Sequence, residues 1–403
     1  MKILIINKFL HPNGGSETYI FGIGRGLASL GHEVEFFGME HPQRIVGNRA
    51  ESYTANMDFR ARGVKRLTYP FRIIYSHEAR KKLRAVLSDF RPSVVHLNNF
   101  NFQLTPSILY EIRSFAKKTK DRIKIVYTAH DYQLLCPNHI MKQYISGECC
   151  TRCISANTFN CTRYKCIHGS FIKSLLGSIE ALVYRRLRTY RLIDVIICPT
   201  NFMKKALANS SILKEKTIVL HNFIEVNDDS LTDEAQNKDT YVLYFGRYSP
   251  EKGVGTLLHV ARQLPEVRFI FAGMGPLNDS VNELLNITNK GFLGGRELND
   301  LIKGAQFALF PSEWYENCPF AVMEAISLGT PVIAADIGGM PELIRAGVNG
   351  DLFISGDAED LREKVSLLWN DRERREAYRT ACNQSLFLSL DEYCKKLLEE
   401  IYV

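Results

Sequence analysis

Short, continuous apolar segments recur along the chain and constrain its fold more than any other feature. Strands of parallel sheets have this form, because helices cover both faces of such sheets. Segments with helical periodicity separate several of them, which predicts repeated β-α-β units. The strand candidates are residues 2–7, 33–37, 94–97, 123–128, 195–199 and 217–220, followed by 241–245, 268–272, 287–292, 307–310 and 331–334.

A polar, acidic stretch between Asn222 and Thr240 divides these segments into two series. A chain of 403 residues also exceeds the length at which a single hydrophobic core usually divides. We therefore predict an α/β protein with two doubly wound, Rossmann-like domains, residues 1–221 and 222–385. In such sheets ligands bind beyond the carboxyl ends of the strands, so residues that follow strands are the first site candidates.

The composition, 45% hydrophobic and 24% charged, is that of an ordinary globular protein. The apolar run at residues 3–6 is too short for a signal peptide, and no stretch reaches the length of a membrane span. We therefore expect a cytoplasmic protein. In a reducing compartment disulfides are disfavoured.

The net charge of +7 is unevenly distributed. Between Arg60 and Arg84 nine basic residues and the single acid Glu78 are mixed with aromatic side chains, and a second basic cluster lies between Arg185 and Arg191. Solvated helix faces are one interpretation, and docking onto the anionic inner face of the plasma membrane is the other. Nucleic acid is disfavoured as a partner, because no recognised nucleic-acid module accompanies the charge.

The first candidate loop contains Gly14 and Gly15. Two glycines allow close backbone approach, and the helix that follows, with Ser16 as its predicted N-cap, offers free N–H groups to a phosphate. A tight turn is the alternative interpretation. The dinucleotide pattern G-x-G-x-x-G is absent from this loop.

The second candidate loop, Gly246 to Gly253, places Arg247 and Lys252 just beyond a predicted strand. Two neighbouring cations suit a diphosphate, whose negative charge grows as the glycosidic bond to it breaks. The alternative is a pair of isolated surface charges.

The third candidate loop leads into a helix and contains Glu316, Pro319 and Glu324. Pro319 fits the first helical position, which leaves Glu316 in the loop and Glu324 nearly two turns inside the helix. A carboxylate among apolar residues needs a partner, and ribose hydroxyls would be one. The alternative is an ordinary surface carboxylate.

Together these loops resemble those of family 4 of the glycosyltransferases, retaining enzymes of the GT-B fold. The resemblance covers nearly the whole chain. It rests on the G-G-S-E sequence from Gly14, G-R-x4-K-G from Gly246, A-G-M-G-P from Ala272, the Glu316/Glu324 pair, and G-T-P from Gly329 with Gly338-Gly339 after it.

The resemblance implies two domains that face each other across a cleft, with the donor bound mainly by the second. It implies that Arg247 and Lys252 bind the donor diphosphate, Glu324 binds the ribose, and Glu316 faces the hydroxyls of the donor sugar. Further donor contacts are implied for a set of neighbouring residues, namely Gly246, Gly273, Asn317, Pro319 and Phe320.

In the first domain, the resemblance implies that Gly14 and Gly15 approach the diphosphate and that His130 lies near the transferred sugar. From the residues alone, a histidine after a strand is more often structural. The C-terminal stretch, about 386–403, is expected to cross back onto this domain. The sequence contains no Asp-x-Asp motif, so no catalytic metal is expected.

Six of the ten cysteines lie between Cys136 and Cys166. Such clustering in a reducing compartment indicates metal binding before disulfides. The best tetrahedral set for a structural zinc ion is Cys150, Cys153, Cys161 and Cys166, with Cys149, Cys136 or His168 as alternatives for one ligand. Reduced packing cysteines and a disulfide are the other interpretations.

The sequence thus predicts a retaining glycosyltransferase, and it leaves the sugar and the acceptor open. We expect transfer from a UDP-sugar to a saccharide or a polyprenyl-lipid-linked acceptor, in synthesis of capsule, exopolysaccharide or lipopolysaccharide-type glycans. The cysteine-rich insertion, about 136–168, is expected to influence acceptor choice. A sugar-nucleotide epimerase of the same fold is the alternative, and a zinc-dependent nucleic-acid-binding protein is a more distant one.

Overall fold

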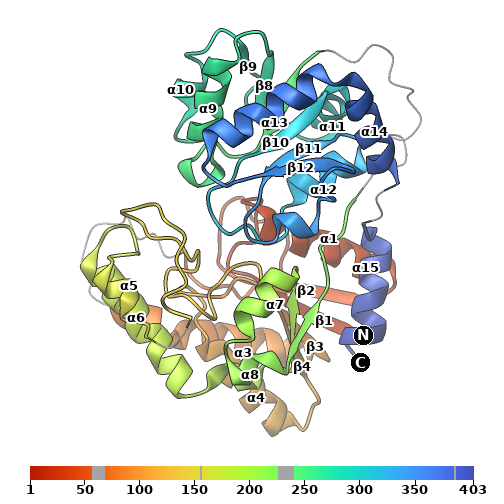
Figure 1. Cartoon of the computed structure of the whole chain (residues 1–403). Coiled ribbons are helices and arrows are strands. Elements are labelled where there is room, and N and C mark those ends of the chain that lie inside the picture. Colours follow the sequence, from red (N-terminus) through yellow and green to blue (C-terminus); the bar gives the residue numbers. More distant parts are fainter. Residues whose placement is uncertain (57–68, 155–156, 226–239, 385–386) are drawn as a thin grey trace. The chain divides into compact units, whose positions relative to one another are not determined.

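The structure is a computed structural model that describes residues 1–56, 69–154, 157–225, 240–384 and 387–403. It divides into two compact units. The first consists of Met1–His221 and Leu390–Val403, and the second of Asn222–Ser389. Each unit contains a six-stranded parallel sheet flanked by helices (Figure 1), which confirms the predicted α/β class with two doubly wound domains.

The sheet of the first unit has the strand order β2-β1-β3-β4-β5-β6. Nearly all residues of its central strands are buried, as expected when helices cover both faces. The order reverses between β1 and β3, and this switch point is where ligands bind in doubly wound sheets. The strands are β1 (Lys2–Ile6), β2 (Glu33–Phe37), β3 (Val94–Leu97), β4 (Lys124–Thr128), β5 (Val195–Cys198) and β6 (Thr217–Val219).

Helices of the first unit include short turns as well as long amphipathic helices. Helix α3 begins with the N-cap Ser76, whose hydroxyl accepts from the N–H of Ala79, and α6 begins in the same way at Ser170. The helices are α1 (Gly15–Ser29), α2 (Tyr69–Ile74), α3 (His77–Phe90), α4 (Ser107–Thr119), α5 (Asn160–Arg163), α6 (Phe171–Arg186), α7 (Asn201–Leu207), α8 (Ser211–Lys214) and α15 (Leu390–Lys396).

The end of the chain packs against the first unit. Helix α15 and the π-helical turn Leu397–Ile401 lie beside α1 (Figure 1). The buried hydroxyls of Tyr19 and Tyr393 are hydrogen-bonded at 2.9 Å, and the hydroxyl of Tyr402 lies 2.6 Å from Nδ1 of His96. The C-terminal residues therefore complete the core of this unit.

The sheet of the second unit has the order β12-β11-β10-β7-β8-β9. Counted from its own first strand, this is the 3-2-1-4-5-6 order of the Rossmann fold, with the switch point between β7 and β10. The strands are β7 (Val242–Phe245), β8 (Phe269–Ala272), β9 (Ile287–Asn289), β10 (Phe307–Phe310), β11 (Val332–Ala335) and β12 (Gly350–Phe353). The helices are α9 (Val254–Gln263), α10 (Asn278–Val281), α11 (Gly295–Gly304), α12 (Phe320–Ser327), α13 (Ala358–Asn370) and α14 (Arg372–Asn383).

Two predicted helix starts are wrong by one or two residues. Helix α1 begins at Gly15 with Gly14 in the N-cap position, so Ser16 lies inside the helix. Helix α12 begins at Phe320, because Pro319 is still extended, with a ψ of 122°, and takes the N-cap position.

Strand β12 was not predicted, because Asp351 interrupts its apolar sequence. The structure accommodates this carboxylate by an ion pair with Arg374 at 3.0 Å.

Candidate functional site

Lys252 and Glu316 meet at the switch point of the second unit. Lys252 follows β7 and Glu316 follows β10, and the Lys252 ammonium donates to Oε1 of Glu316 at 2.6 Å. The Ser312 hydroxyl donates to the same oxygen at 2.8 Å. Burial opposes ionisation of Glu316, but the neighbouring ammonium outweighs it and lowers the pKa of this carboxyl. The pair is therefore charged at neutral pH.

Glycines allow the loops of this site to pack closely. Gly253 has a φ of +69°, and a Cβ there would lie 1.6 Å from the carbonyl oxygen of Pro311. A Cβ on Gly338 would lie 2.2 Å from the carbonyl oxygen of Glu316. No other residue fits at these positions without backbone movement. The loops after β7, β10 and β11 are thus fixed around Glu316.

Arg247 lies on the surface of the same site. Gly246 and Gly273 bring the loops after β7 and β8 together, since a Cβ on Gly273 would lie 1.9 Å from the carbonyl oxygen of Gly246. The Arg247 guanidinium is exposed and forms an ion pair with Glu251 at 2.9 Å. An exposed ion pair of this kind is weak, so the guanidinium is available to a ligand.

Helix α12 contributes Glu324 and an open N-terminus. No side chain caps its first turn. Glu324 is half-buried beside the apolar residues of the helix, and burial raises the pKa of its carboxyl. Within the described residues its carboxylate forms no hydrogen bond or ion pair. Asn317 lies in the preceding loop, and Phe320 packs against Phe223 with ring centroids 5.7 Å apart.

The switch point of the first unit is made largely of amide side chains. Asn7 Nδ2 donates to Oε1 of Glu17 at 2.8 Å, and the Ser16 hydroxyl donates to the same oxygen at 2.9 Å. Asn99 Nδ2 donates to the Ser16 hydroxyl at 3.0 Å. Burial raises the pKa of the Glu17 carboxyl. Within the described residues the buried Oδ1 of Asn99 has no hydrogen-bond partner.

His130 follows β4 at the same edge of this sheet. Its Nε2 lies 2.9 Å from Oδ1 of Asn98, which can only accept, so Nε2 carries the proton and Nδ1 presents a lone pair. The ring contacts Tyr19 edge to face, with centroids 4.7 Å apart. Burial lowers the pKa of His130 to about 3, so the imidazole is neutral at physiological pH.

The predicted site residues therefore fall into two groups. Lys252 and Glu316 are in contact in the second unit, where Arg247 and Glu324 also lie, whereas Gly14, Gly15 and His130 belong to the first. Sequence reasoning missed Asn7, Glu17 and the asparagines after β3. Their position directly after strands, or in the first turn of α1, was the signal that could have identified them.

The predicted zinc site is not supported. Within the described part of the chain, no three His, Cys, Asp or Glu side chains are placed to hold one metal ion. The Cys153 thiol instead donates a hydrogen bond to the carbonyl oxygen of Thr158 at 4.0 Å. None of the ten cysteines, all of which lie within the described residues, forms a disulfide.

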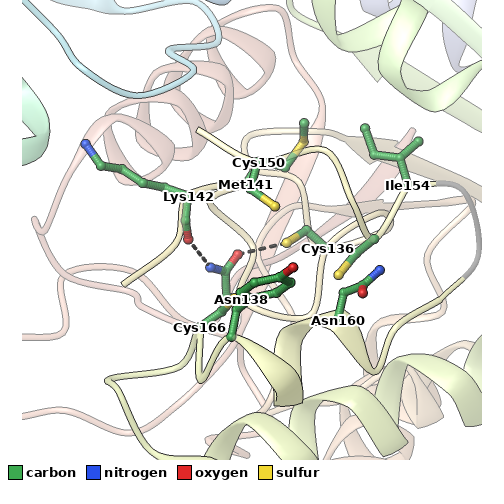
Figure 2. Close-up of a pocket in the computed structure, with 10 residues that line it drawn as sticks. Cys136, Asn138, Met141, Lys142, Cys150, Ile154, Asn160 and Cys166 are labelled. Atoms are coloured by element: carbon green, nitrogen blue, oxygen red, sulfur yellow. Dashed lines mark hydrogen bonds between the residues drawn. The ribbon is translucent and has the colours of Figure 1, made fainter. Parts of the chain in front are cut away.

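Of the predicted ligands, Cys150 lies near the Arg152 guanidinium, with 3.9 Å between its sulfur and Nη1 of Arg152. Several of these cysteines line a cavity of about 10 Å³, room for about one water molecule. There Asn138 accepts a hydrogen bond from the Cys136 thiol at 2.8 Å and donates to the carbonyl oxygen of Lys142 (Figure 2). Cys153, Cys161 and Cys166 belong to one buried apolar cluster, against which Tyr164 and Ile167 pack.

The predicted membrane-binding segment, Arg60 to Arg84, lies partly outside the described residues, which leave out Lys65 and Arg66. Of its described arginines, Arg80 and Arg84 both form ion pairs with the buried Glu111, at 3.0 and 2.6 Å. These two guanidinium groups hold α3 against α4. None of the described helices is long and apolar enough to span a membrane.

Two family models together match most of the chain. One described as Glycosyltransferase Family 4 matches residues 13–228, and one described as Glycosyl transferases group 1 matches residues 228–384. An uncharacterized 42.6 kDa protein in the cps region of Klebsiella pneumoniae is 23% identical over 376 residues, which cover 90% of this chain and 91% of that protein.

Sulfoquinovosyl transferase SQD2 of Arabidopsis thaliana is 38% identical over 141 residues, which cover 34% of this chain and 28% of that enzyme. This chain thus spans less than a third of that relative. The crystal structure of Anabaena Alr3699/HepE in complex with UDP has a TM-score of 0.67 to this chain at 18% identity, with 99% of each chain covered. This likeness shows the GT-B fold. Because the Family 4 model covers more than half of the chain, the protein belongs to glycosyltransferase family 4.

Proposed function

We propose that this protein transfers a sugar, with retention of configuration, from a UDP-sugar to a saccharide or lipid-linked acceptor. The observation that carries the proposal is the arrangement at the β7/β10 switch point. There an exposed guanidinium, a fixed ammonium, an open helix N-terminus and an unpaired carboxylate belong to one unit of Rossmann topology. The UDP complex of the Anabaena protein supports UDP as the nucleotide of the donor.

The cationic groups suit the diphosphate. Arg247 can exchange its weak contact with Glu251 for two charge-assisted hydrogen bonds to phosphate oxygens. The Lys252 ammonium has three donor hydrogens, of which Glu316 takes one. As the glycosidic bond breaks, these charges stabilise the leaving UDP. This arrangement requires no metal ion for departure of the leaving group.

Glu324 is suited to the ribose. Its half-buried carboxylate has a raised pKa and accepts no hydrogen bond within the described residues. Two ribose hydroxyls would donate to it and favour its ionised form. For the acceptor we propose only a class, a glycan of capsule, exopolysaccharide or lipopolysaccharide type. The similarity to a protein from a cps region of Klebsiella pneumoniae supports this class.

Thermal stabilisation by nucleotides tests the donor site. UDP, GDP, ADP and NAD are added separately, because a ligand that binds only the native state raises Tm. We expect a shift with UDP that is lost in Arg247→Ala and in Glu324→Ala. A shift with NAD alone would overturn the proposal.

Product analysis distinguishes transfer from epimerisation. With UDP-sugar alone, a transferase releases UDP only slowly, by hydrolysis, and leaves the sugar configuration unchanged. Conversion of the sugar to its epimer without an acceptor would instead identify the protein as an epimerase.

A further inference from the structure

Five large apolar side chains are exposed in the cysteine-rich segment, residues 136–168, and at the start of α6, and the four besides Phe159 form two adjacent pairs. Tyr144, Ile145, Phe171 and Ile172 are 58%, 70%, 55% and 70% exposed. We call these four residues the insertion patch. Side chains of this size are normally buried, and a group of them on one surface marks an interaction site.

The two halves of the insertion patch are neighbours in space. Tyr144 lies in the turn bounded by the bridge between Lys142 and Cys149. Its ring centroid is 6.1 Å from that of His168, and a Cβ on Gly169 would lie 3.3 Å from its ring. Helix α6 begins two residues later at Phe171. The turn therefore lies directly beside the first turn of α6.

The segment that contains the insertion patch is rich in basic residues. Between Cys136 and Lys173 the chain has five basic residues and the single acid Glu148. Arg163, Lys165 and Lys173 are exposed and form no ion pair within the described residues. The carboxylate of Glu148 accepts from Gln143 and Ser146 of the same turn. Within the described residues the charges of Arg163, Lys165 and Lys173 therefore remain uncompensated, unlike those of Arg80 and Arg84.

We propose that the insertion patch docks this protein onto an anionic phospholipid surface. Apolar and aromatic side chains enter the boundary between headgroups and acyl chains, while the cations of the same segment attract the anionic headgroups. A second copy of the chain is disfavoured as the occupant, because two such surfaces carry the same charge. The inference rests on the proposed function in one respect, since a lipid-linked acceptor would be presented at such a surface.

Vesicle sedimentation tests the insertion patch. The full chain is mixed with vesicles of phosphatidylcholine alone, or of phosphatidylcholine with phosphatidylglycerol. We expect binding to the mixed vesicles only, reduced severalfold in Ile145→Ser/Ile172→Ser and in Lys165→Gln/Lys173→Gln. The control variant Leu285→Ser/Phe292→Ser removes two apolar side chains that are also exposed, 106% and 75%, but lie in the second unit. It should bind as the unaltered protein does.

Three outcomes would overturn the inference. These are binding by both patch variants at the level of the control, equal binding to the two kinds of vesicle, and a dimer in solution that the patch variants abolish. The UDP-induced rise in Tm is measured on the same proteins. If UDP does not raise the Tm of the unaltered protein, the proposed donor is contradicted. If a patch variant loses vesicle binding but UDP still raises its Tm, the change affects the insertion patch and not the donor site.

Discussion

The switch points of the two units differ in chemistry although both belong to doubly wound parallel sheets. In the second unit the site contains Arg247, Lys252 and two glutamates, and glycines fix its loops. In the first unit the corresponding loops present asparagines, a serine and a neutral histidine. Cations suit a diphosphate, whereas amide groups suit neutral hydroxyls. The same topology thus presents different polar groups at the two edges.

The two units differ most clearly in the partners of a buried carboxylate and in the resulting shift of its pKa. Glu316 has an ammonium partner, and its pKa is lowered. Glu17 has an amide and a hydroxyl as partners, and desolvation prevails, so its pKa is raised. A charged partner compensates for lost hydration better than neutral donors do. The proposals for the two edges can therefore be tested through these two carboxylates and their neighbours.

The largest effect is expected for Lys252→Ala. Removal of the ammonium leaves Glu316 buried without its counter-charge, which costs about 3–5 kcal/mol in the free energy of unfolding. Urea unfolding measures this loss. The double variant Lys252→Ala/Glu316→Gln serves as the control and should recover most of it, because no uncompensated charge remains. If the free energy of unfolding fell equally in the single and double variants, the charge of Glu316 would not be the cause of the loss.

A loss of activity without a loss of stability is expected for Arg247→Ala. The guanidinium is exposed and its ion pair with Glu251 is weak, so Tm should stay unchanged. The value of kcat/KM for the UDP-sugar should fall about 10²–10³-fold, as when one preorganised donor to a developing charge is removed. Arg262→Ala is the matched control, because Arg262 is another exposed arginine of this unit with an acidic partner. If both variants lost activity equally, Arg247 would have no special role.

Opposite pH dependences are expected for the two carboxylates. The lowered pKa of Glu316 means that its ionised form adds stability at neutral pH, and this contribution is lost as pH falls below the ordinary value of 4.5. The raised pKa of Glu17 means that its contribution is present below 4.5 and is lost as pH rises through the folded-state pKa.

These signs can be read from the Tm of Glu316→Gln and Glu17→Gln between about pH 2 and pH 8. Relative to the unaltered protein, Glu316→Gln should be less stable at neutral pH, with the difference shrinking in acid. Glu17→Gln keeps the acceptor for Asn7 and should gain stability as pH rises. Each difference is expected to be about 1 kcal/mol, or about 2–4 °C in Tm. Parallel pH curves for the two variants would remove the contrast between the two edges.

Much of this fold could be predicted from the sequence, because the strands of a parallel sheet are continuous apolar segments. Strands β2, β3 and β10 have the predicted bounds. Strand β12 was missed, since Asp351 breaks its pattern and the compensating Arg374 lies 23 residues away. Helix starts shifted because Gly14 and Pro319 take extended conformations that residue preferences alone do not fix.

Less of the candidate site than of the fold could be predicted from the sequence. Charged residues after strands suggested a diphosphate site, but the contact between Lys252 and Glu316, 64 residues apart, depends on the order of strands in the sheet. The cysteine spacing suggested zinc, whereas the direction of each thiol depends on packing, and the Cys136 thiol donates to Asn138. Local sequence therefore indicated which groups are present, and the topology decided which of them meet.

The smallest effect is expected for Gly14→Ala. Gly14 has an extended backbone, with φ near 180°, and an added Cβ would lie 3.6 Å from Oε2 of Glu17, an ordinary contact. The fold itself therefore does not require glycine there, in contrast to Gly253, and Tm should change little. If the backbone at Gly14 approaches the donor diphosphate, the added methyl group should raise KM for the UDP-sugar severalfold while kcat falls less. Steady-state kinetics measure both. An unchanged KM would place the diphosphate away from this loop and leave donor recognition to the charged edge of the second unit.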